Sequence, residues 1–319
     1  MTKARIRGWI NEYGTDGVYI SFSGGKDSTV LLDIVRQDHP EIPAVFIDTG
    51  LEYPEIRNFV RSHENVTWLK PEMNFRSVIQ AYGYPFISKE ISQKVYECRQ
   101  AEARGHESVM RKQFQGTYVS KNGKTNLHDV TKWKFLTKAP FMISSKCCSV
   151  MKKRPAKRYE KETGRMPITA QMAEESLLRK QTWMRQGCNA FEAKRPVSNP
   201  MAFWTEQDVL QYIRTRGLKI ASVYGDIVEE NEIPGQMNIS DYIQAEQPKL
   251  KITGCQRTGC IFCGYGCHRE KPGEGKFELL KITHPKIYDY IMRPWVEGGL
   301  NYKEVIDWLN ENGNLNIRY

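Results

Sequence analysis

Residues 17–28, GVYISFSGGKDS, are the stretch that decides the fold. The first six are a short, apolar, β-prone run, and a turn with two adjacent glycines follows at residues 23–25. Over residues 27–37 apolar side chains recur along one helical stripe. The stretch therefore predicts a buried strand, a glycine turn and the beginning of a helix.

The same alternation continues along the chain. We expect strands at residues 17–22, 43–47, 66–69 and 166–170, and helices at residues 27–37, 54–62, 174–186, 205–216, 285–295 and 302–312. Strands separated by helices are typical of βαβ units and a parallel sheet. The predicted fold class is α/β, a Rossmann-like, doubly wound and mostly parallel sheet with a smaller, largely helical, Cys-rich C-terminal region. We expect a domain at 1–200, with an insertion at about 90–140, and a second region at 201–319.

Composition limits the classes of function. The 319 residues include 47 Lys and Arg against 37 Asp and Glu, which gives a net charge of +10 and suggests an anionic partner: a nucleotide, a sulfate ester or a nucleic acid. No apolar run approaches the ~20 residues of a membrane-spanning helix. Residues 1–14 lack the apolar segment of a secretory signal. We therefore expect a cytoplasmic protein with no membrane partner.

The loop at residues 21–28 has the chemistry of a phosphate site. Its glycines let the backbone approach a ligand, and the N–H groups at the start of a helix favour an anion. Lys26 adds a positive charge, and the Ser23 and Ser28 hydroxyls can donate to phosphate oxygens. The alternative is a glycine turn that only caps the helix.

A second segment, residues 47–55 (IDTGLEYPE), follows the next expected strand. Open parallel sheets bind ligands at the carboxyl ends of their strands. Alone, Asp48 could equally be a turn residue. Beside the loop at 21–28, it is interpreted as a residue near the nucleotide or a metal ion.

The eight cysteines are unevenly distributed, with an adjacent pair at residues 147–148 and four within residues 255–267. In a reducing compartment such clustering indicates metal binding or redox chemistry rather than disulfides. A pair of adjacent cysteines followed by a distant CxxC, here Cys260 and Cys263, is a more specific signal of a metal or redox site than a lone CxxC. A four-cysteine zinc site and cysteines without a ligand are the alternatives.

These motifs together resemble a known family. Residues 21–28 match the SGGxDS loop of the PP-loop, or adenine nucleotide α-hydrolase-like, superfamily, whose members typically bind ATP and cleave it between its α and β phosphates. Residues 47–55 look like an element of phosphoadenosine phosphosulfate (PAPS) and adenosine phosphosulfate (APS) reductases. The CC…CxxC pattern resembles that of the reductases with a 4Fe–4S cluster. The resemblance to the PAPS reductase family covers roughly residues 15–300, without 95–140.

The resemblance implies a set of site residues. The nucleotide, either ATP or PAPS/APS, would be bound by Ser21, Phe22, Ser23, Gly24, Gly25, Lys26, Asp27, Ser28, Asp48, Thr49 and Gly50. The 4Fe–4S cluster would be bound by Cys147, Cys148, Cys260 and Cys263. Catalytic roles would fall to Lys26, Asp27, Asp48 and Cys267, and Mg²⁺ would bridge phosphates with help from Asp27 or Asp48.

The chain departs from the family pattern in three places. The loop is the full SGGKDS of ATP-cleaving members, whereas dedicated sulfonucleotide reductases usually have a degraded version. Those reductases attack sulfur with a cysteine near the C-terminus, and here no cysteine follows Cys267. Either Cys267 or Cys255 would have to replace it, although each could instead be a ligand, a persulfide carrier or inert. The family's G-x-R reads Ala170-Gln171-Met172, without the arginine that would meet substrate anions.

Three hypotheses follow. The first is an oxidoreductase of the PAPS/APS type, which forms a cysteine thiosulfonate that a thiol reductant resolves to sulfite. The second is an ATP-pyrophosphatase-type sulfur transferase, which takes sulfur from a donor and acts on nucleic acid in DNA phosphorothioation or tRNA thiolation. The basic run at residues 152–158 would bind the phosphate backbone of a nucleic acid, or it would simply form a solvent-exposed surface. The third is a zinc-stapled, non-enzymatic nucleic-acid-binding subunit. We also consider that two copies of the chain form a homodimer.

Overall fold

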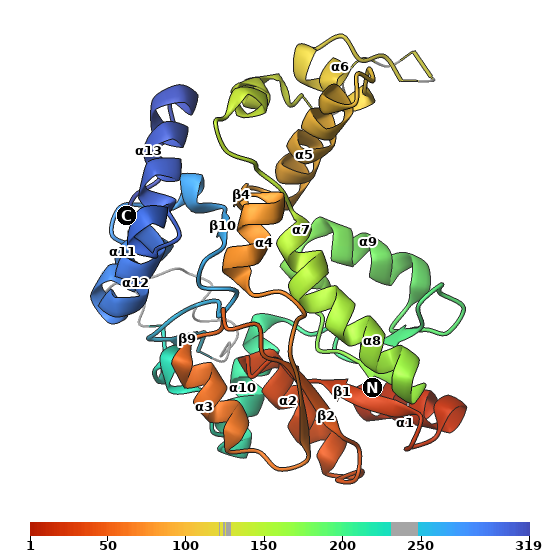
Figure 1. Ribbon diagram of the computed structural model, residues 1–319. Helices are drawn as coiled ribbons and strands as arrows, with labels where there is room; N and C mark the ends of the chain where they lie inside the picture. Colours follow the sequence, from red (N-terminus) through yellow and green to blue (C-terminus); the bar gives the residue numbers. More distant parts are fainter. Residues whose placement is uncertain (121, 124, 126–128, 231–247) are drawn as a thin grey trace, which may run out of the picture. The chain divides into compact units, whose positions relative to one another are not determined.

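The computed structural model describes residues 1–120, 122–123, 125, 129–230 and 248–319 (Figure 1). The chain forms two compact units that interleave along the sequence. Unit 1 comprises Met1–Asp48, Glu52–Lys70 and Pro155–Gly259, and unit 2 comprises Thr49–Leu51, Pro71–Arg154 and Cys260–Tyr319. The division expected at residue 200 stays a prediction. Within the expected insertion, residues 121, 124 and 126–128 lie outside the described residues.

Unit 1 contains a six-stranded sheet in the order β3-β2-β1-β5-β7-β6. Its strands are β1 (Val18–Ser21), β2 (Ala44–Ile47), β3 (Val66–Leu69), β5 (Met166–Ile168), β6 (Asn189–Ala190) and β7 (Val197–Ser198). All neighbours are parallel except β6 and β7. A separate antiparallel pair joins β8 (Ile227–Glu229) to β9 (Leu250–Ile252). The predicted α/β fold with a mostly parallel sheet is confirmed.

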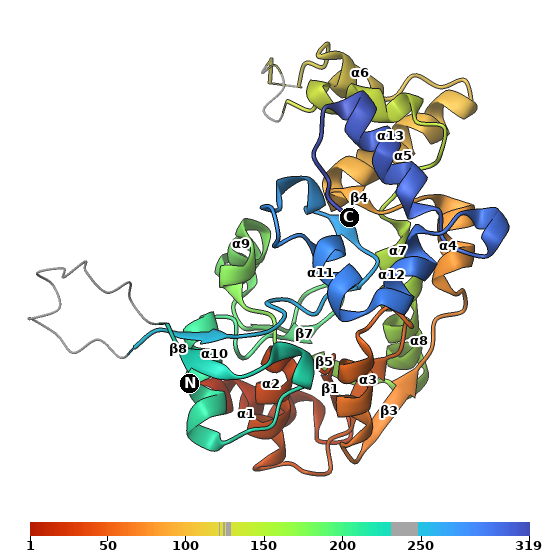
Figure 2. The same ribbon diagram turned by 90° about the vertical axis from the view of Figure 1, so that its left-hand side faces the viewer.

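Helices surround this sheet in unit 1 (Figures 1 and 2). They are α1 (Thr2–Tyr13), α2 (Lys26–Arg36), α3 (Pro54–Arg61), α8 (Arg154–Thr163), α9 (Leu177–Gln186) and α10 (Glu206–Arg216), with short 3₁₀ helices η3 (Ala173–Glu175) and η4 (Ser222–Tyr224). Thr205 and Asp208 form the reciprocal cap of α10, in which the Thr205 side chain accepts from the Asp208 N–H and the Asp208 carboxylate accepts from the Thr205 N–H.

The core of unit 1 follows from strand alternation. Val18 and Ile20 of β1 are fully buried. Tyr19 points to the opposite face, where it packs with Val45 and with Tyr159 of α8. Both faces of β1 are therefore covered, which explains why its first three residues are hydrophobic.

One expected helix is interrupted. Residues 174–186 were expected to form a continuous helix, but the 3₁₀ helix η3 ends at Glu175 and α9 begins at Leu177. Ser176 between them is extended, and its side chain accepts a hydrogen bond from the Arg179 N–H. A serine that caps a new helix competes with continuation of the old one.

Unit 2 is mainly helical. Its helices are α4 (Phe75–Tyr82), α5 (Lys89–Ala103), α6 (Val109–Gln115), α7 (Lys146–Cys148), α11 (Lys276–Thr283), α12 (Pro285–Met292) and α13 (Tyr302–Gly313). The 3₁₀ helices η1 (Thr131–Lys138), η6 (Cys267–Arg269) and η7 (Trp295–Glu297) and the π-helix η2 (Ser149–Lys153) complete them. Asn74 and Ser88 cap α4 and α5 with their side chains.

A short parallel pair, β4 (Phe86–Ile87) and β10 (Gly264–Tyr265), lies at the centre of unit 2. A Cβ at Gly264 would lie 2.4 Å from the Phe86 ring, so the two strands can approach only with glycine there. The fully buried Tyr302 donates from its hydroxyl to the Phe262 carbonyl at 2.6 Å and packs on Phe86. The C-terminal helix α13 thus fixes the chain just before β10.

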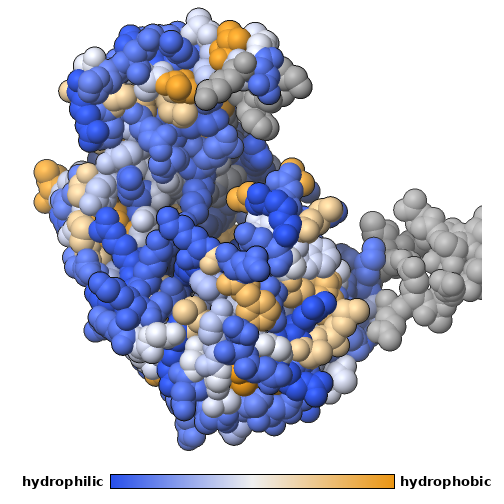
Figure 3. All heavy atoms as spheres, turned by 90° about the vertical axis from the view of Figure 1, so that its right-hand side faces the viewer, coloured by the Kyte–Doolittle hydropathy of each residue, from blue (hydrophilic) through white to orange (hydrophobic). Residues whose placement is uncertain are grey.

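Hydrophilic residues predominate on the face drawn in Figure 3, with hydrophobic residues scattered among them. Within the described residues, no helix is both long enough and apolar enough to span a membrane.

Candidate functional site

The turn between β1 and α2 depends on Gly24. Its φ of 72° lies in the left-handed region, and a Cβ there would lie 2.7 Å from the Val60 Cγ2 and 2.8 Å from the Ile56 Cγ2. Both neighbours are buried on α3. Only glycine therefore satisfies the backbone conformation and the close packing together.

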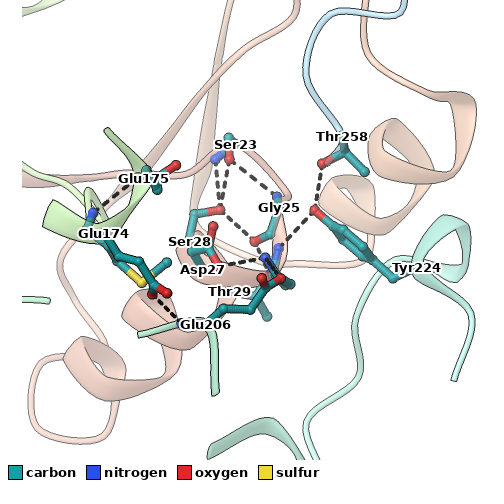
Figure 4. Close-up of polar contacts among 12 residues, drawn as sticks. Ser23, Gly25, Asp27, Ser28, Thr29, Glu174, Glu175, Glu206, Tyr224 and Thr258 are labelled. Atoms are coloured by element: carbon teal, nitrogen blue, oxygen red, sulfur yellow. Dashed lines mark hydrogen bonds and ion pairs between the residues drawn. The ribbon is translucent and has the colours of Figure 1, made fainter. Parts of the chain in front are cut away.

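The loop is held by its own serines. The Ser23 N–H donates to the Ser28 Oγ at 3.2 Å, the Ser28 hydroxyl donates to the Gly25 carbonyl at 2.9 Å, and the Gly25 N–H donates to the Ser23 Oγ at 3.3 Å (Figure 4). Gly25 is the N-cap of α2 and gives it no side-chain cap. The first N–H groups of a helix lack partners within the helix, so this end can receive an anion.

Lys26 is 7% exposed and ion-paired on two sides. Its ammonium lies 3.2 Å from Asp27 Oδ1 and 3.3 Å from Glu206 Oε1. Burial lowers the pKa of Lys26, but the two carboxylates outweigh burial and the net pKa is raised. The lysine is therefore held as a cation at the start of α2.

Tyr224 of η4 contacts the same point from another part of unit 1. Its hydroxyl oxygen accepts from the Lys26 N–H at 3.1 Å and lies 2.6 Å from the Thr258 Oγ1 (Figure 4). The Tyr224 side chain is buried, which raises the pKa of its hydroxyl. This tyrosine ties the loop at 254–259 to the beginning of α2.

A cavity of about 440 Å³ in unit 1 opens in front of this loop. Its lining residues are Ser23, Gly25, Lys26, Asp27, Met172, Glu174, Glu175, Glu206, Tyr224, Gln256, Arg257, Thr258 and Gly259. Four of the predicted nucleotide residues are among them. Ser21, Phe22, Gly24, Ser28, Asp48, Thr49 and Gly50 do not line the cavity. Of these, Gly24 and Ser28 shape the loop that does, and the binding roles of all of them stay predictions.

Asp48 follows β2 directly, as expected, but it is paired within its own unit. Its carboxylate accepts from the Arg57 Nη2 at 2.8 Å, and its N–H donates to the Leu69 carbonyl at 2.8 Å. Asp48 is buried, so the ion pair with Arg57 neutralises its charge. The predicted contact of Asp48 with a nucleotide or metal stays a prediction.

The sequence did not point to the part of the cavity lining formed by Tyr224 and residues 256–259. Tyr224 and residues 256–259 carry no motif and lie about 200 positions from the loop they contact. Only Glu206 offered a signal, because the cap at Thr205 marked the beginning of the helix that carries it.

Four cysteines gather inside unit 2. Cys147 and Cys148 lie in α7, and Cys260 and Cys263 immediately precede β10. The chain before α7 joins the β4 region, because the Ser144 N–H donates to the Tyr84 carbonyl at 3.1 Å. The Tyr265 hydroxyl of β10 donates to the Ser144 carbonyl at 3.3 Å. These bonds hold the segment before α7 beside β10, and the charges of Cys260 and Cys263 act on Cys147, although 112 positions separate Cys148 from Cys260.

The thiols perturb one another. The Cys147 thiol donates to the Cys148 sulfur, and this bond is the main reason that the pKa of Cys147 is raised and that of Cys148 is lowered to about 6. Cys260 and Cys263 also raise the pKa of Cys147. Lys89, Lys152 and Lys153 lower the pKa of Cys148, so basic neighbours favour its thiolate.

The π-helix η2 follows Cys148 directly and carries two of these lysines. Short π-helical turns occur frequently at functional sites. Among the described residues, no group of three or more His, Cys, Asp or Glu side chains is placed to hold a single metal ion.

The two remaining candidate cysteines differ in environment. Cys267 is buried, and burial is the main cause that raises its pKa to about 12. Cys255 of unit 1 is partly exposed and lies next to the cavity wall at residues 256–259. Its Sγ is 3.9 Å from the Tyr53 hydroxyl oxygen. The nucleophilic role predicted for Cys267 stays a prediction.

Comparison with known proteins gives a family match over most of the chain. The model of the phosphoadenosine phosphosulfate reductase domain matches residues 17–102 and 107–264. A segment of 51 residues is 37% identical to a phosphoadenosine 5'-phosphosulfate reductase of Xanthomonas euvesicatoria pv. vesicatoria, covering 16% of this chain and 21% of that protein. A segment of 62 residues is 42% identical to the protein of the same name from Buchnera aphidicola subsp. Acyrthosiphon pisum. It covers 19% of this chain and 25% of that protein. The matched segments thus span about a fifth to a quarter of these relatives.

Among solved structures, a phosphoadenylyl-sulfate (PAPS) reductase from Candida auris in a phosphate complex is similar with a TM-score of 0.40 and 14% sequence identity. The match covers 69% of this chain and 82% of that one.

We predict that Tyr224→Phe destabilises unit 1 by about 1–3 kcal/mol, because the buried Lys26 N–H loses its acceptor. Urea denaturation monitored by fluorescence measures this loss. Tyr212→Phe is the matched control: its hydroxyl bonds to Asp33 nearer the surface, so water can replace it and the loss is smaller. Equal stability of Tyr224→Phe and the native chain would contradict the role assigned to Tyr224.

We predict that Cys267 resists iodoacetamide at about pH 8 in the folded chain, because a thiol with a pKa of about 12 is almost entirely protonated there. Peptide mass spectrometry detects the modification. Cys255, which is partly exposed, is expected to react, and Cys267 is expected to react once the chain is denatured. Rapid alkylation of Cys267 in the folded chain would instead support its role as a nucleophile.

Proposed function

Because the chain belongs to the phosphoadenosine phosphosulfate reductase family, we propose that it is an enzyme of sulfur metabolism that acts on an adenine nucleotide. The observation that carries the proposal is the loop at residues 23–28. Its turn at Gly24 presents the start of α2, together with a buried, charged Lys26, to a cavity of about 440 Å³. A phosphate group bound there would receive backbone N–H donors and the lysine charge.

The residues around the loop have separate tasks in this proposal. Asp27 and Glu206 keep Lys26 charged, and the ammonium exchanges these partners for phosphate oxygens when the nucleotide binds. Ser23 and Ser28 hold the loop in shape. A Mg²⁺ ion that bridged the phosphates would find the Asp27 carboxylate in the same cavity.

We further propose that Cys147, Cys148, Cys260 and Cys263 hold a 4Fe–4S cluster. What supports this ligand set is that four thiols from two segments lie in one unit and influence one another's pKa. Lys89, Lys152 and Lys153 favour the thiolate form of Cys148 that ligation requires. A bound cluster would supply a redox-active and electrostatic centre in unit 2.

Two reactions are compatible with this site. A reductase would release sulfite from PAPS or APS, and a nucleophilic cysteine and a thiol reductant would take part. An ATP-dependent sulfur transferase would release pyrophosphate, and the undegraded SGGKDS loop with its Lys26 favours this second candidate. The basic run at residues 152–158 is weaker support for a nucleic-acid acceptor, because several of its charges already have partners within the chain. Lys152 and Lys153 lower the pKa of Cys148, and Arg158 donates to the Lys70 carbonyl.

We predict that Lys26→Ala lowers nucleotide turnover by about 100-fold, because the variant loses the charge that faces the phosphates. The assays are pyrophosphate release from ATP and sulfite release from PAPS and APS, run in parallel on anaerobically purified protein. Lys180→Ala on the exposed surface of α9 is the control and is expected to keep full turnover. Undiminished turnover of Lys26→Ala would remove the loop from the mechanism.

We predict that the double substitution of Cys147→Ser and Cys148→Ser abolishes bound iron and visible absorbance, because two of the four thiolates are lost. Metal analysis of anaerobically purified protein measures iron and zinc together. Cys98→Ser is the control, since Cys98 is a buried cysteine of α5 outside the cluster. Iron retained by the double variant would place the ligands elsewhere, and stoichiometric zinc in the native chain would favour the zinc-stapled binding subunit.

A further inference from the structure

Unit 2 contains an aromatic cavity of about 300 Å³ that neither proposed site uses. Its lining residues are Ile79, Gln80, Tyr84, Phe141, Met142 and Trp295, and none of them lines the cavity in front of the phosphate loop. Three are aromatic, two are aliphatic, and only Gln80 carries an amide. Small-molecule sites are commonly built in this way, from apolar and aromatic side chains with a few polar groups that orient the ligand.

Backbone contacts fix one part of the lining. Gly83, which ends α4, has a φ of 97°, and a Cβ there would lie 2.2 Å from the carbonyl carbon and oxygen of Met142. Only glycine therefore lets the two segments touch. The Tyr84 N–H donates to the Met142 carbonyl at 2.8 Å, and the Ser144 N–H donates to the Tyr84 carbonyl at 3.1 Å. These contacts hold Tyr84 and Met142 side by side at the cavity.

Trp295 of η7 has the largest ring of the lining, and two neighbours hold it. The Arg76 guanidinium carbon lies 5.2 Å from the centre of the indole ring, which is a cation–π contact. The same guanidinium donates to the Gly298 carbonyl at 2.8 Å, in the turn that follows η7. The Tyr84 ring centre is 6.5 Å from that of Trp295, and the Tyr84 hydroxyl donates to the Leu300 carbonyl at 3.0 Å. An aromatic wall that is already ordered loses little conformational entropy when a ligand binds to it.

The polar groups at the aromatic cavity indicate what the ligand carries. Gln80 is exposed on α4, and within the described part of the chain its amide has no hydrogen-bond partner. A glutamine amide offers both donors and an acceptor, which match the edge of a nucleobase. Arg76 contacts two carbonyls and the indole ring, so among the described residues no carboxylate neutralises its charge.

A flat heteroaromatic ring next to a phosphate fits this combination. Aromatic side chains stack on the face of any base. The Gln80 amide would meet the edge of the base, and the Arg76 charge would attract its phosphate or the adjoining phosphate of a strand. A phenolic or aliphatic side chain of a peptide would fill the same space, but it would leave the Gln80 amide and the Arg76 charge without a role.

We propose that the aromatic cavity of unit 2 binds a nucleobase, which stacks against Trp295 and is contacted at its edge by Gln80. The site goes beyond the proposed function, since it does not depend on a nucleotide bound at residues 23–28. The base belongs to a free nucleotide or to a single-stranded nucleic acid. The two sources share this chemistry, and the experiment below distinguishes them.

The test is photochemical cross-linking of the full chain to 5-iodouridine, whose base forms a covalent bond to a side chain in contact with it. The probe is supplied as the free 5'-monophosphate and, separately, within an oligouridine of about ten nucleotides. Peptide mass spectrometry locates the cross-link, which we expect at Trp295 or Phe141. A cross-link there with the monophosphate identifies a free nucleotide as a sufficient ligand. A cross-link there with the oligonucleotide alone identifies a strand.

Variants are then compared with the ligand that cross-links, by fluorescence anisotropy for the oligonucleotide or by calorimetry for the monophosphate. Trp295→Ala should bind about tenfold more weakly, because the stacking surface is lost. Trp295→Phe keeps a ring and should retain most of the affinity, which separates a loss of stacking from a loss of folding. Gln80→Ala removes only an exposed amide and should bind about threefold more weakly.

Val296→Ala is the matched control. Val296 is 94% exposed, follows Trp295 directly and does not line the cavity, so this variant should bind as the native chain does. Cross-links confined to other segments, or none with either probe, would overturn the proposal. Native affinity of both Trp295→Ala and Gln80→Ala would overturn it as well.

The peptide alternative is tested by competition with 4-methylphenol, which has the ring of a tyrosine side chain but no base edge. We expect uridine 5'-monophosphate to displace the bound probe at a much lower concentration than 4-methylphenol does. Equal displacement by the two compounds would show that the aromatic cavity takes an apolar side chain, and the proposal would be wrong.

Discussion

The left-handed turn at Gly24, packed against Ile56 and Val60, is the constraint on which the proposed nucleotide site depends. It ends β1, points the start of α2 at the cavity, and places Lys26 where Asp27 and Glu206 keep it charged. A side chain at Gly24 would push α3 away from the loop. The backbone conformation at Gly24 thus sets where the start of α2 and Lys26 lie, and the neighbouring carboxylates then keep Lys26 charged.

A comparable constraint operates in unit 2, where the Cα of Gly264 lies against the Phe86 ring and β10 can pair with β4. That pairing brings the CxxC segment beside the chain that leads into α7. The consequence is chemical: Cys147 and Cys148 share a hydrogen bond, and nearby lysines favour the thiolate of Cys148. Each unit therefore carries one of the two proposed kinds of chemistry, phosphate binding in unit 1 and cluster ligation by thiolates in unit 2.

Much of this could be predicted from local sequence. The run at residues 66–69 forms β3 with the expected bounds, and the Thr205 cap begins α10 as expected. The helix expected at 174–186 was wrong at its beginning because Ser176 caps a new helix. Tyr224 could not be found from sequence, because its role arises from a contact across about 200 positions, which no periodicity records.

The measurement that tests the central claim most directly is hydrogen–deuterium exchange of the full chain with and without ATP or adenosine 5'-phosphosulfate. The account predicts slower amide exchange at residues 23–28 and at 256–259 when the nucleotide binds, because both segments line the same cavity. Binding with unchanged exchange at residues 23–28, and protection elsewhere, would contradict the claim that this loop holds the phosphates.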